Sequence, residues 1–251
     1  MGGLLVPENK ETMQVTTKAI VLRAIKYGET SLIVKMYTLS SGIRSYMLKG
    51  ILAAKKGKMK AAYFQPLAQL EIVAVHKDKG ALEHLKEVRV SYHCQSLHTH
   101  IAKNAITFFL AEMIANSIHE EEPNKELFQF IEASLQWLDA HDNYANFHLL
   151  FLLTLSRFLG FYPEEKNKDF PYFDLLEGEF VKEPTLNSFL EGRELFYFKS
   201  ILGISFDAIE GVRIGKNDRK NLLNNLVLFY ELQLQGFRKP KSLAVLNEVF
   251  S

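Results

Sequence analysis

The stretch "TTKAIVLRAIKYGETSLIVKMYTL" (residues 16–39) holds two runs rich in β-branched and aliphatic residues, with the turn "YGE" between them. The two faces of the second run differ, with Leu32, Val34 and Met36 on one face and Lys35 and Tyr37 on the other. An alternation with a period of two is typical of a half-buried strand. The stretch therefore predicts two consecutive strands, at 16–27 and 30–39.

Three further strands are predicted after this pair, at 42–50, 64–76 and 81–90. Five short strands within about 75 residues, with a long connection between the third and the fourth, favour a small barrel or a sandwich. Residues 1–15 are interpreted as an N-terminal extension, in which Met13 is an alternative start.

The period changes after residue 95, where apolar residues recur three or four positions apart, as in amphipathic helices. Helices are predicted at 96–119, 125–141, 143–163, 184–202, 217–237 and 239–250. The helix at 143–163 is apolar almost all round, which predicts a central buried position, and Gly160 is expected to end it. The expected architecture is α+β: a β-domain at 16–92 and a helical domain at 93–251, with an irregular segment at 164–186.

Composition limits the possible classes of protein. The chain has 251 residues, 47% of them hydrophobic, and a net charge of +1. Its longest apolar run, at 147–155, is about half of what a bilayer span needs, so no membrane helix is expected. The N-terminus lacks the pattern of a secretion signal, and the single cysteine, Cys94, excludes an internal disulfide. These features predict a cytoplasmic protein.

The small net charge hides an asymmetry along the chain. Residues 1–80 carry 13 Lys+Arg and 5 Asp+Glu, a net charge of +8, and the remainder carries −7. Much of the excess lies in "KGILAAKKGKMKAAYF" (49–64), with Lys49, Lys55, Lys56, Lys58 and Lys60. A basic first third joined to an acidic remainder places any contact with a polyanion in the first part.

The basic connection has two interpretations, a solvated surface or a binding site. It joins two strands of the predicted barrel, where this architecture presents ligands. Cations beside aromatic rings suit single strands, since bases stack while phosphates pair with lysine. The flanking residues of these kinds are Arg44, Tyr46, Tyr63 and Phe64. The predicted DNA-binding residues are therefore Arg44, Lys49, Lys55, Lys56, Lys58 and Lys60, with non-specific binding that weakens as salt rises.

The sequence offers little for catalysis. It contains neither a P-loop nor a GxGxxG motif. A metal site could be imagined from Cys94 with His93, His98 and His100, but His98 and His100 do not share a helix face. The glutamates at 120–122 could hold a cation for nuclease chemistry, yet no second acidic cluster accompanies them. No catalytic residue is predicted.

Four segments, in this order and spacing, resemble the bacterial RecO family: "AIVLRAIKYGETSLIVKMYTLSSGIRSYMLKGI" (19–51), "FQPLAQLEI" (64–72), "LLTLSRFLGFYP" (152–163) and "LLNNLVLFYELQLQGFRKPKSLAVLNEV" (222–249). Together they cover nearly the whole chain from about residue 16, in keeping with the domain order predicted above.

The resemblance implies an N-terminal OB-fold barrel followed by an all-helical C-terminal domain. It also implies a recombination mediator that binds single- and double-stranded DNA, anneals complementary strands and assists RecA loading with RecR on SSB-coated DNA. The helical domain is then expected to receive the acidic, apolar-ended tail of SSB. Three cations lie beside apolar residues near the end of the chain, Arg238, Lys239 and Lys241. They are interpreted either as the contact for that tail or as solubilising residues at a helix junction.

One segment departs from the family pattern. Many members carry four zinc-binding cysteines after the Leu-Gly-Phe-x-Pro exit, but residues 164–184 of this chain contain no cysteine. We therefore expect no zinc and no other cofactor, and we expect aromatic burial to pack this segment instead, through Phe170, Tyr172, Phe173 and Phe180. Two other classes of function stay open: a protein-interaction adapter with no direct DNA role, and a metal-dependent nuclease.

Overall fold

The structure, a computed structural model, describes residues 13–53, 59–76, 82–119 and 122–250. The chain divides into two compact units. We call residues 1–93 with 120–125 the barrel unit, and residues 94–119 with 126–251 the helical unit. The division after His93 lies one residue beyond the predicted boundary, and the acidic segment that follows the first predicted helix groups with the barrel unit.

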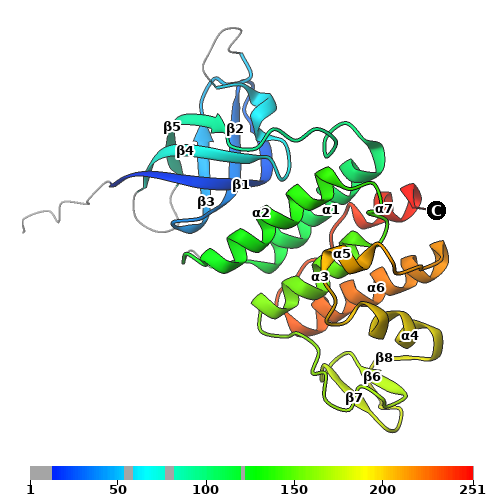
Figure 1. Cartoon of the computed structure of the whole chain (residues 1–251). Coiled ribbons are helices and arrows are strands. Elements are labelled where there is room, and N and C mark those ends of the chain that lie inside the picture. The colour runs from blue at the N-terminus through cyan, green and yellow to red at the C-terminus, as the bar shows by residue number, and fades with distance from the viewer. Residues whose placement is uncertain (1–12, 54–58, 77–81, 120–121, 251) are drawn as a thin grey trace, which may run out of the picture. The chain divides into compact units, whose positions relative to one another are not determined.

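Five strands form the barrel unit: β1 (Met13–Tyr27), β2 (Ser31–Thr38), β3 (Gly42–Leu48), β4 (Gln69–His76) and β5 (Glu83–Val90). They hydrogen-bond in the order β1-β2-β3-β5-β4, and β4 pairs with β1, so the sheet closes into a barrel (Figure 1). All pairs are antiparallel except β3 with β5.

The predicted alternation in β2 is confirmed. Leu32, Val34 and Met36 are buried in the barrel core beside Ile72 of β4 and Leu85 of β5. Side chains on one face of each strand fill the interior, because the sheet curls round on itself.

Two predicted limits in the barrel unit are wrong. Residues 13–15, assigned to the extension, belong to β1 and pair with β4. The strand predicted from residue 64 starts only at Gln69, after the short 3-10 helix η1 (Ala61–Phe64). Pro66 has no N–H to donate to a ladder, and Leu67 has a φ of 59°, so the chain cannot be regularly extended before Gln69.

The helical unit contains α1 (Ile101–Ser117), α2 (Lys125–Ala140), α3 (Phe147–Phe158), α4 (Gly192–Ile201), α5 (Phe206–Ile209), α6 (Lys216–Gln233) and α7 (Leu243–Val249). Nearly every side chain of α3 is buried, as predicted for a central helix. The buried Tyr230 hydroxyl of α6 donates to the Leu152 carbonyl of α3 at 2.6 Å. Gly160, with a φ of 85°, follows the end of α3 and supplies the left-handed turn.

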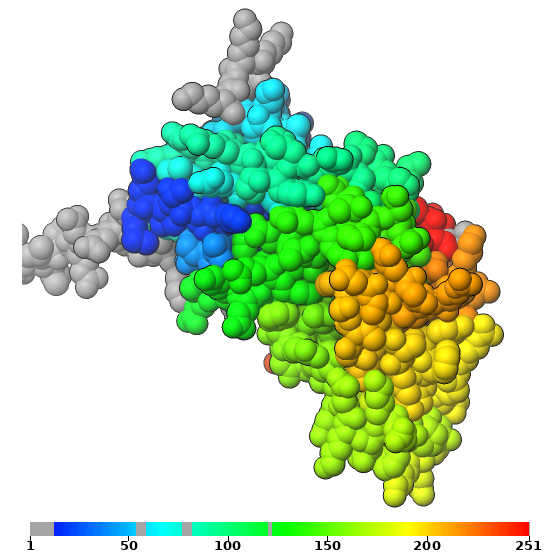
Figure 2. All heavy atoms as spheres, viewed as in Figure 1, coloured from blue at the N-terminus to red at the C-terminus, as the bar shows by residue number. Residues whose placement is uncertain are grey.

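The C-terminal domain is not all-helical, which corrects the expectation from the family. A three-stranded sheet in the order β7-β6-β8 lies at one end of the helical unit (Figures 1 and 2). Its strands are β6 (Tyr172–Asp174), β7 (Glu179–Val181) and β8 (Phe189–Glu191). The segment 164–186 is therefore partly regular, and the helix predicted from 184 begins only at Gly192, because β8 pairs with β6.

Aromatic burial packs this small sheet. Phe173 and Phe180 are buried, and the Phe173 ring centroid lies 4.9 Å from that of Phe180 and 4.7 Å from that of Phe198. The buried Asp174 carboxylate accepts hydrogen bonds from the Leu176 and Glu177 amides. The hypothesis that aromatic residues pack the segment is thus supported for Phe173 and Phe180, while Phe170 and Tyr172 are half-buried.

Candidate nucleic-acid interface

A groove of about 580 Å³ opens on the barrel unit where β3 ends. Among the described residues, β3 and β5 pair only at Tyr46 with Glu83 and at Met47 with His84. Beyond these pairs β3 ends while β5 continues alongside β4, so β5 is left with one unpaired side. That gap in the hydrogen bonding is where the groove forms.

Cations stand over an apolar floor in this groove. The floor includes the buried residues Leu48, Ile51, Leu85 and Val88, and the exposed charged residues among the lining are Lys49, Lys86, Glu87 and Arg89. Three cations against one carboxylate give a local excess of positive charge, and of these Lys86 directs its Nζ to Gln14 Oε1 of β1, at 2.6 Å, outside the lining. Such a surface can pair with phosphates and pack against apolar or aromatic groups at the same time.

Lys49 and Lys60, two of the predicted residues, are exposed. Lys49 lines the groove, and Lys60 follows the lining residue Met59. Lys55, Lys56 and Lys58 lie outside the described residues, so their predicted role stays a prediction.

Arg44 lies elsewhere in the barrel. It is half-buried in β3, opposite the buried Met36 and two residues before the buried Tyr46. This position faces the barrel interior, near the start of β3, whereas Lys49 follows the end of β3. The structure therefore does not bring Arg44 together with Lys49 and Lys60.

A buried polar cluster surrounds the inner end of Arg44. The Tyr46 hydroxyl and His76 Nε2 are 2.9 Å apart, and His76 Nδ1 is 3.3 Å from the Ser41 hydroxyl. Burial raises the pKa of Tyr46, helped by the negative charge of the buried Glu83. The Arg44 charge acts on both residues: it partly offsets the raised pKa of Tyr46 and adds to burial in lowering the pKa of His76, so Arg44 belongs to the electrostatic surroundings of this internal cluster.

The aromatic rings expected to stack on bases are also placed differently. Tyr46 and Phe64 belong to the barrel core, and Tyr63 packs against it. The exposed ring is instead Tyr27, near the end of β1, at 58% exposure. The sequence pattern places Tyr27 at the end of the strand 16–27 and in the turn "YGE", and Tyr27 is not among the residues predicted to contact DNA.

Tyr27 belongs to a mixed cationic and apolar face on β1 and β2. Directly opposite residues share one face of a sheet, and the pairs here are Arg23 with Lys35, Ile25 with Ile33, and Tyr27 with Ser31. Ile25 is 46% exposed. Burial lowers the pKa of Lys35, and the neighbouring Arg23 charge lowers it further. A bound anion would relieve this repulsion between two cations.

A second groove, of about 520 Å³, lies in the helical unit between α1 and α7. Its lining includes the exposed residues Ile101, Phe108 and Val245. Ser242 joins the two helices, because its amide and hydroxyl donate to Glu112 Oε2 at 3.0 and 2.9 Å.

The predicted cations Arg238, Lys239 and Lys241 are exposed in the segment that enters α7. The Arg238 carbonyl accepts a 2.6 Å hydrogen bond from Asn116 Nδ2 on α1, and Lys241 directly precedes Ser242 of the groove. None of the three cations lines the α1–α7 groove itself; Lys241 lies next to it in sequence, and the role of the three as a contact for a partner stays a prediction.

The possible metal ligands around Cys94 do not gather. In the part of the chain that the structure describes, no three His, Cys, Asp or Glu side chains form a group suited to a metal. Burial and the Asp139 charge raise the pKa of the half-buried Cys94 thiol to about 11. His100 Nδ1 is instead 3.3 Å from the Tyr144 hydroxyl.

The described helices include none long and apolar enough to cross a membrane. Two family models match most of the chain. Residues 13–93 match the N-terminal domain of recombination protein O, and residues 98–244 match its C-terminal domain.

Curated relatives agree with both matches. A DNA repair protein RecO from Christiangramia forsetii is 53% identical over 238 residues, which cover 95% of this chain and all of the relative. A protein of the same name from Flavobacterium psychrophilum is 47% identical over 239 residues, with the same coverage. The one from Porphyromonas gingivalis is 30% identical over 250 residues, which again cover 95% of this chain and all of the relative.

Proposed function

Because this chain belongs to the RecO family of DNA repair proteins, we propose that it is a recombination mediator that binds single- and double-stranded DNA and anneals complementary strands. The barrel unit then serves as an OB-fold, the five-stranded architecture that presents oligonucleotides on one face and its adjoining loops. The observation that carries the proposal is the groove on the barrel unit, which is lined by Lys49, Lys86 and Arg89 and by buried apolar residues.

The proposed mechanism is charge neutralisation. Lysine and arginine side chains pair with phosphates on two strands, lower the repulsion between them and hold them close, and base pairing supplies the remaining free energy. The chemistry is independent of base identity, since these cations contact the backbone. No covalent bond forms or breaks in this mechanism, so we propose a non-enzymatic role without a nucleotide or metal cofactor.

The helical unit is proposed to dock a protein partner. An acidic peptide that ends in apolar residues, such as the tail of SSB, suits the α1–α7 groove, because Phe108 and Val245 offer apolar surface and Lys241 offers charge. In this proposal the protein works with RecR in the bacterial cytoplasm, at the nucleoid, and helps RecA to load on SSB-coated strands.

A second candidate function is a protein-interaction adapter with no direct DNA role. The exposed apolar α1–α7 groove favours it. It predicts that labelled single strands do not bind even at low salt, whereas the DNA-binding proposal predicts a complex that weakens steeply as salt rises.

The test is a salt titration with labelled single strands on the triple variant Lys49→Ala, Lys86→Ala, Arg89→Ala. Each phosphate contact on a single strand contributes about −0.7 to the slope of log K against log salt, so loss of three contacts makes the slope shallower by about 2. The same titration with duplex DNA shows whether both forms of DNA use this groove.

The matched control is Lys166→Ala, Lys182→Ala, Arg213→Ala, which removes equal charge from exposed positions of the helical unit. It should keep the wild-type slope. A parallel variant with Lys55, Lys56, Lys58 and Lys60 replaced by alanine tests the basic connection in an annealing assay. If the groove variant keeps wild-type affinity and slope while it remains folded, the groove is not the DNA site.

A further inference from the structure

A small cavity of about 190 Å³ lies at the N-terminus of α6, apart from both grooves described above. His148 of α3 lines it together with the first turns of α6 and the end of α7. The α6 residues in its lining include Lys216, Arg219 and Lys220, so three cations meet around one small space.

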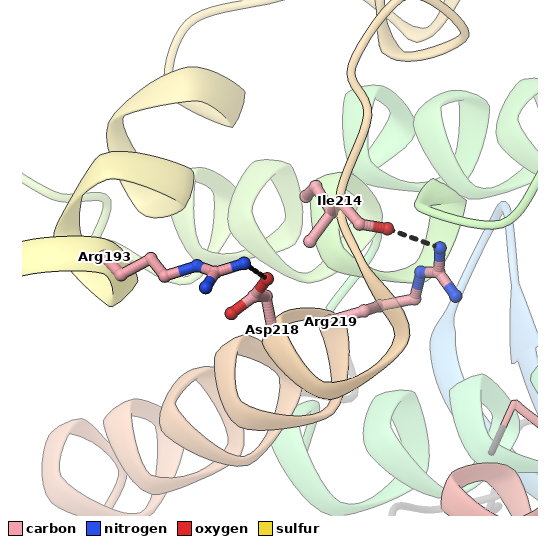
Figure 3. Close-up of polar contacts among 4 residues, drawn as sticks. All are labelled: Arg193, Ile214, Asp218 and Arg219. Atoms are coloured by element: carbon pink, nitrogen blue, oxygen red, sulfur yellow. Dashed lines mark hydrogen bonds and ion pairs between the residues drawn. The ribbon is translucent and has the colours of Figure 1, made fainter.

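The charge of Arg219 is not neutralised by its hydrogen-bond partners. Its Nε donates to the Asn146 side-chain oxygen, and its Nη2 donates to the Ile214 carbonyl, each at 2.9 Å. Both acceptors are neutral. The adjacent carboxylate, Asp218, instead accepts a 2.7 Å bond from Arg193. Figure 3 shows that Asp218 and Arg219 point to opposite sides of α6.

His148 supplies an independent sign that a ligand belongs here. Its side chain is only 1% exposed, and its Nδ1 has no hydrogen-bond partner in the structure. Burial lowers the pKa of this imidazole to about 3, and the Arg219 charge contributes to the shift. A buried polar atom without a partner is costly, and a bound acceptor in the cavity would remove that cost.

The start of α6 adds further donors. Gly215 is the N-cap residue and has no side chain with which to cap the first turn. Backbone N–H groups at an uncapped N-terminus, together with the positive end of the helix dipole, favour anions.

We propose that this cavity binds a phosphate group, held by Lys216, Arg219 and Lys220, with His148 donating a hydrogen bond from Nδ1. Three cations suit a doubly charged tetrahedral anion better than a single carboxylate, and the volume limits the ligand to a small group. The phosphate can be free inorganic phosphate or the terminal phosphate of a nucleotide. The site is independent of the proposed DNA groove, which lies in the other unit.

The test follows the His148 imidazole by nitrogen-detected NMR in the full-length protein, during titration with inorganic phosphate at constant ionic strength. Sodium chloride replaces phosphate in the control titration. Phosphate should shift the His148 ring resonances and raise the pKa of the imidazole, because the anion stabilises its protonated form. Chloride should do neither.

The double variant Lys216→Ala, Lys220→Ala should bind phosphate about tenfold more weakly or worse, since two charge-assisted contacts are lost. The matched control Lys166→Ala, Lys182→Ala should bind like the wild type. Thymidine 5′-monophosphate, compared with thymidine, separates the two sources: a His148 shift with the monophosphate alone assigns the site to nucleotide ends, and a shift with inorganic phosphate alone assigns it to the free ion.

Two results would overturn the proposal. One is a His148 signal that neither phosphate compound moves. The other is a phosphate-induced shift of the same size and midpoint in the double variant, which would mean that the anion acts elsewhere.

Discussion

Asp139 shows how much one side chain can organise in the helical unit. Its nearly buried carboxylate accepts hydrogen bonds from the amides of Gln95, Ser96 and Leu97, the shortest at 2.7 Å. Lys103 Nζ donates to the Asp139 carbonyl at 3.0 Å. The segment that leads into α1 is thus fixed to the end of α2 by one acidic residue.

Replacing Asp139 with asparagine should destabilise the protein by about 1.5–3 kcal/mol at neutral pH, because a charged acceptor of several hydrogen bonds is lost. Burial raises the pKa of the Asp139 carboxyl, but hydrogen bonds from the Gln95, Ser96 and Leu97 amides outweigh it and hold the pKa below its usual value.

Because the pKa of Asp139 is lower in the folded state than in the unfolded state, its carboxylate adds to the free energy of unfolding above its unfolded-state pKa of about 3.9. This stabilisation is lost as the pH falls through the folded-state pKa. The difference in unfolding free energy between wild type and variant should therefore shrink as the pH falls below about 3.9, the unfolded-state pKa of aspartate. Urea denaturation at several pH values measures it. The exposed Asp169→Asn serves as the control, and a difference independent of pH would contradict the expectation.

At the scale of elements, the ribbon of β1 and β2 carries the exposed aromatic side chain of the barrel unit described above. Tyr27→Ala should weaken single-strand binding by about 1–3 kcal/mol, the usual value of one base–aromatic stack. Its unfolding midpoint should stay near that of the wild type, because the ring is 58% exposed. Phe196→Ala, an exposed ring of the helical unit, is the control for fluorescence-anisotropy titrations, and equal affinities for both variants would exclude Tyr27 from the interface.

The small sheet offers a prediction about stability. Phe173→Ala should cost about 3–5 kcal/mol, since a fully buried ring among Phe180 and Phe198 is replaced by a cavity. Leu186→Ala, at a fully exposed position, should change stability little. Thermal unfolding compares the two variants, and similar midpoints would show that aromatic packing does not hold the sheet.

Local patterns predicted the elements better than the site. The alternation of Leu32, Val34 and Met36 indicated both a strand and its buried face, and Gly160 indicated the end of α3. Lys86 and Arg89 were missed, because "EHLKEVRV" has the polar pattern of any exposed strand face. Only the parallel pairing of β3 with β5 brings them beside Lys49, and no local pattern specifies a pairing between distant strands.

Other errors have similar causes. Arg44 and Phe64 have the residue types of a DNA-binding surface. Arg44 faces the barrel interior because the closed sheet curves round it, and this curvature is a property of the sheet rather than of a residue. Phe64 ends the short helix η1 and is buried in the barrel core. The strand β8 was read as the start of a helix, because three residues are too few to show a period.

At the scale of the whole molecule, the first third of the chain carries a net positive charge and the remainder a net negative charge. We expect two kinds of partner to bind to these two parts. We expect polyanions to bind through the barrel unit and acidic peptides only where the helical unit gathers cations, as it does beside Ser242. The small net charge of +1 would not reveal this division.

The molecule should also fold without metal. Purified protein is expected to contain far less than one zinc per chain, and a chelator should leave both the unfolding midpoint and the rate of annealing unchanged, because the buried rings of Phe173 and Phe180 pack the segment 164–186. Atomic spectroscopy after dialysis provides the measurement. Stoichiometric zinc, or a midpoint lowered by the chelator, would refute this expectation.

Two residue pairs join β3 to β5 in the part of the chain that the structure describes, and this is the shortest of the ladders described for the barrel. Thermal fluctuation will separate it before the long antiparallel ladders, and deuterium should enter the amides of Met47 and His84 early. Once parted, the cylinder becomes a curled open sheet with two bare edges, and such edges recruit strands from other chains. We therefore expect self-association of the barrel to start at the exposed edges of β3 and β5, beside the groove.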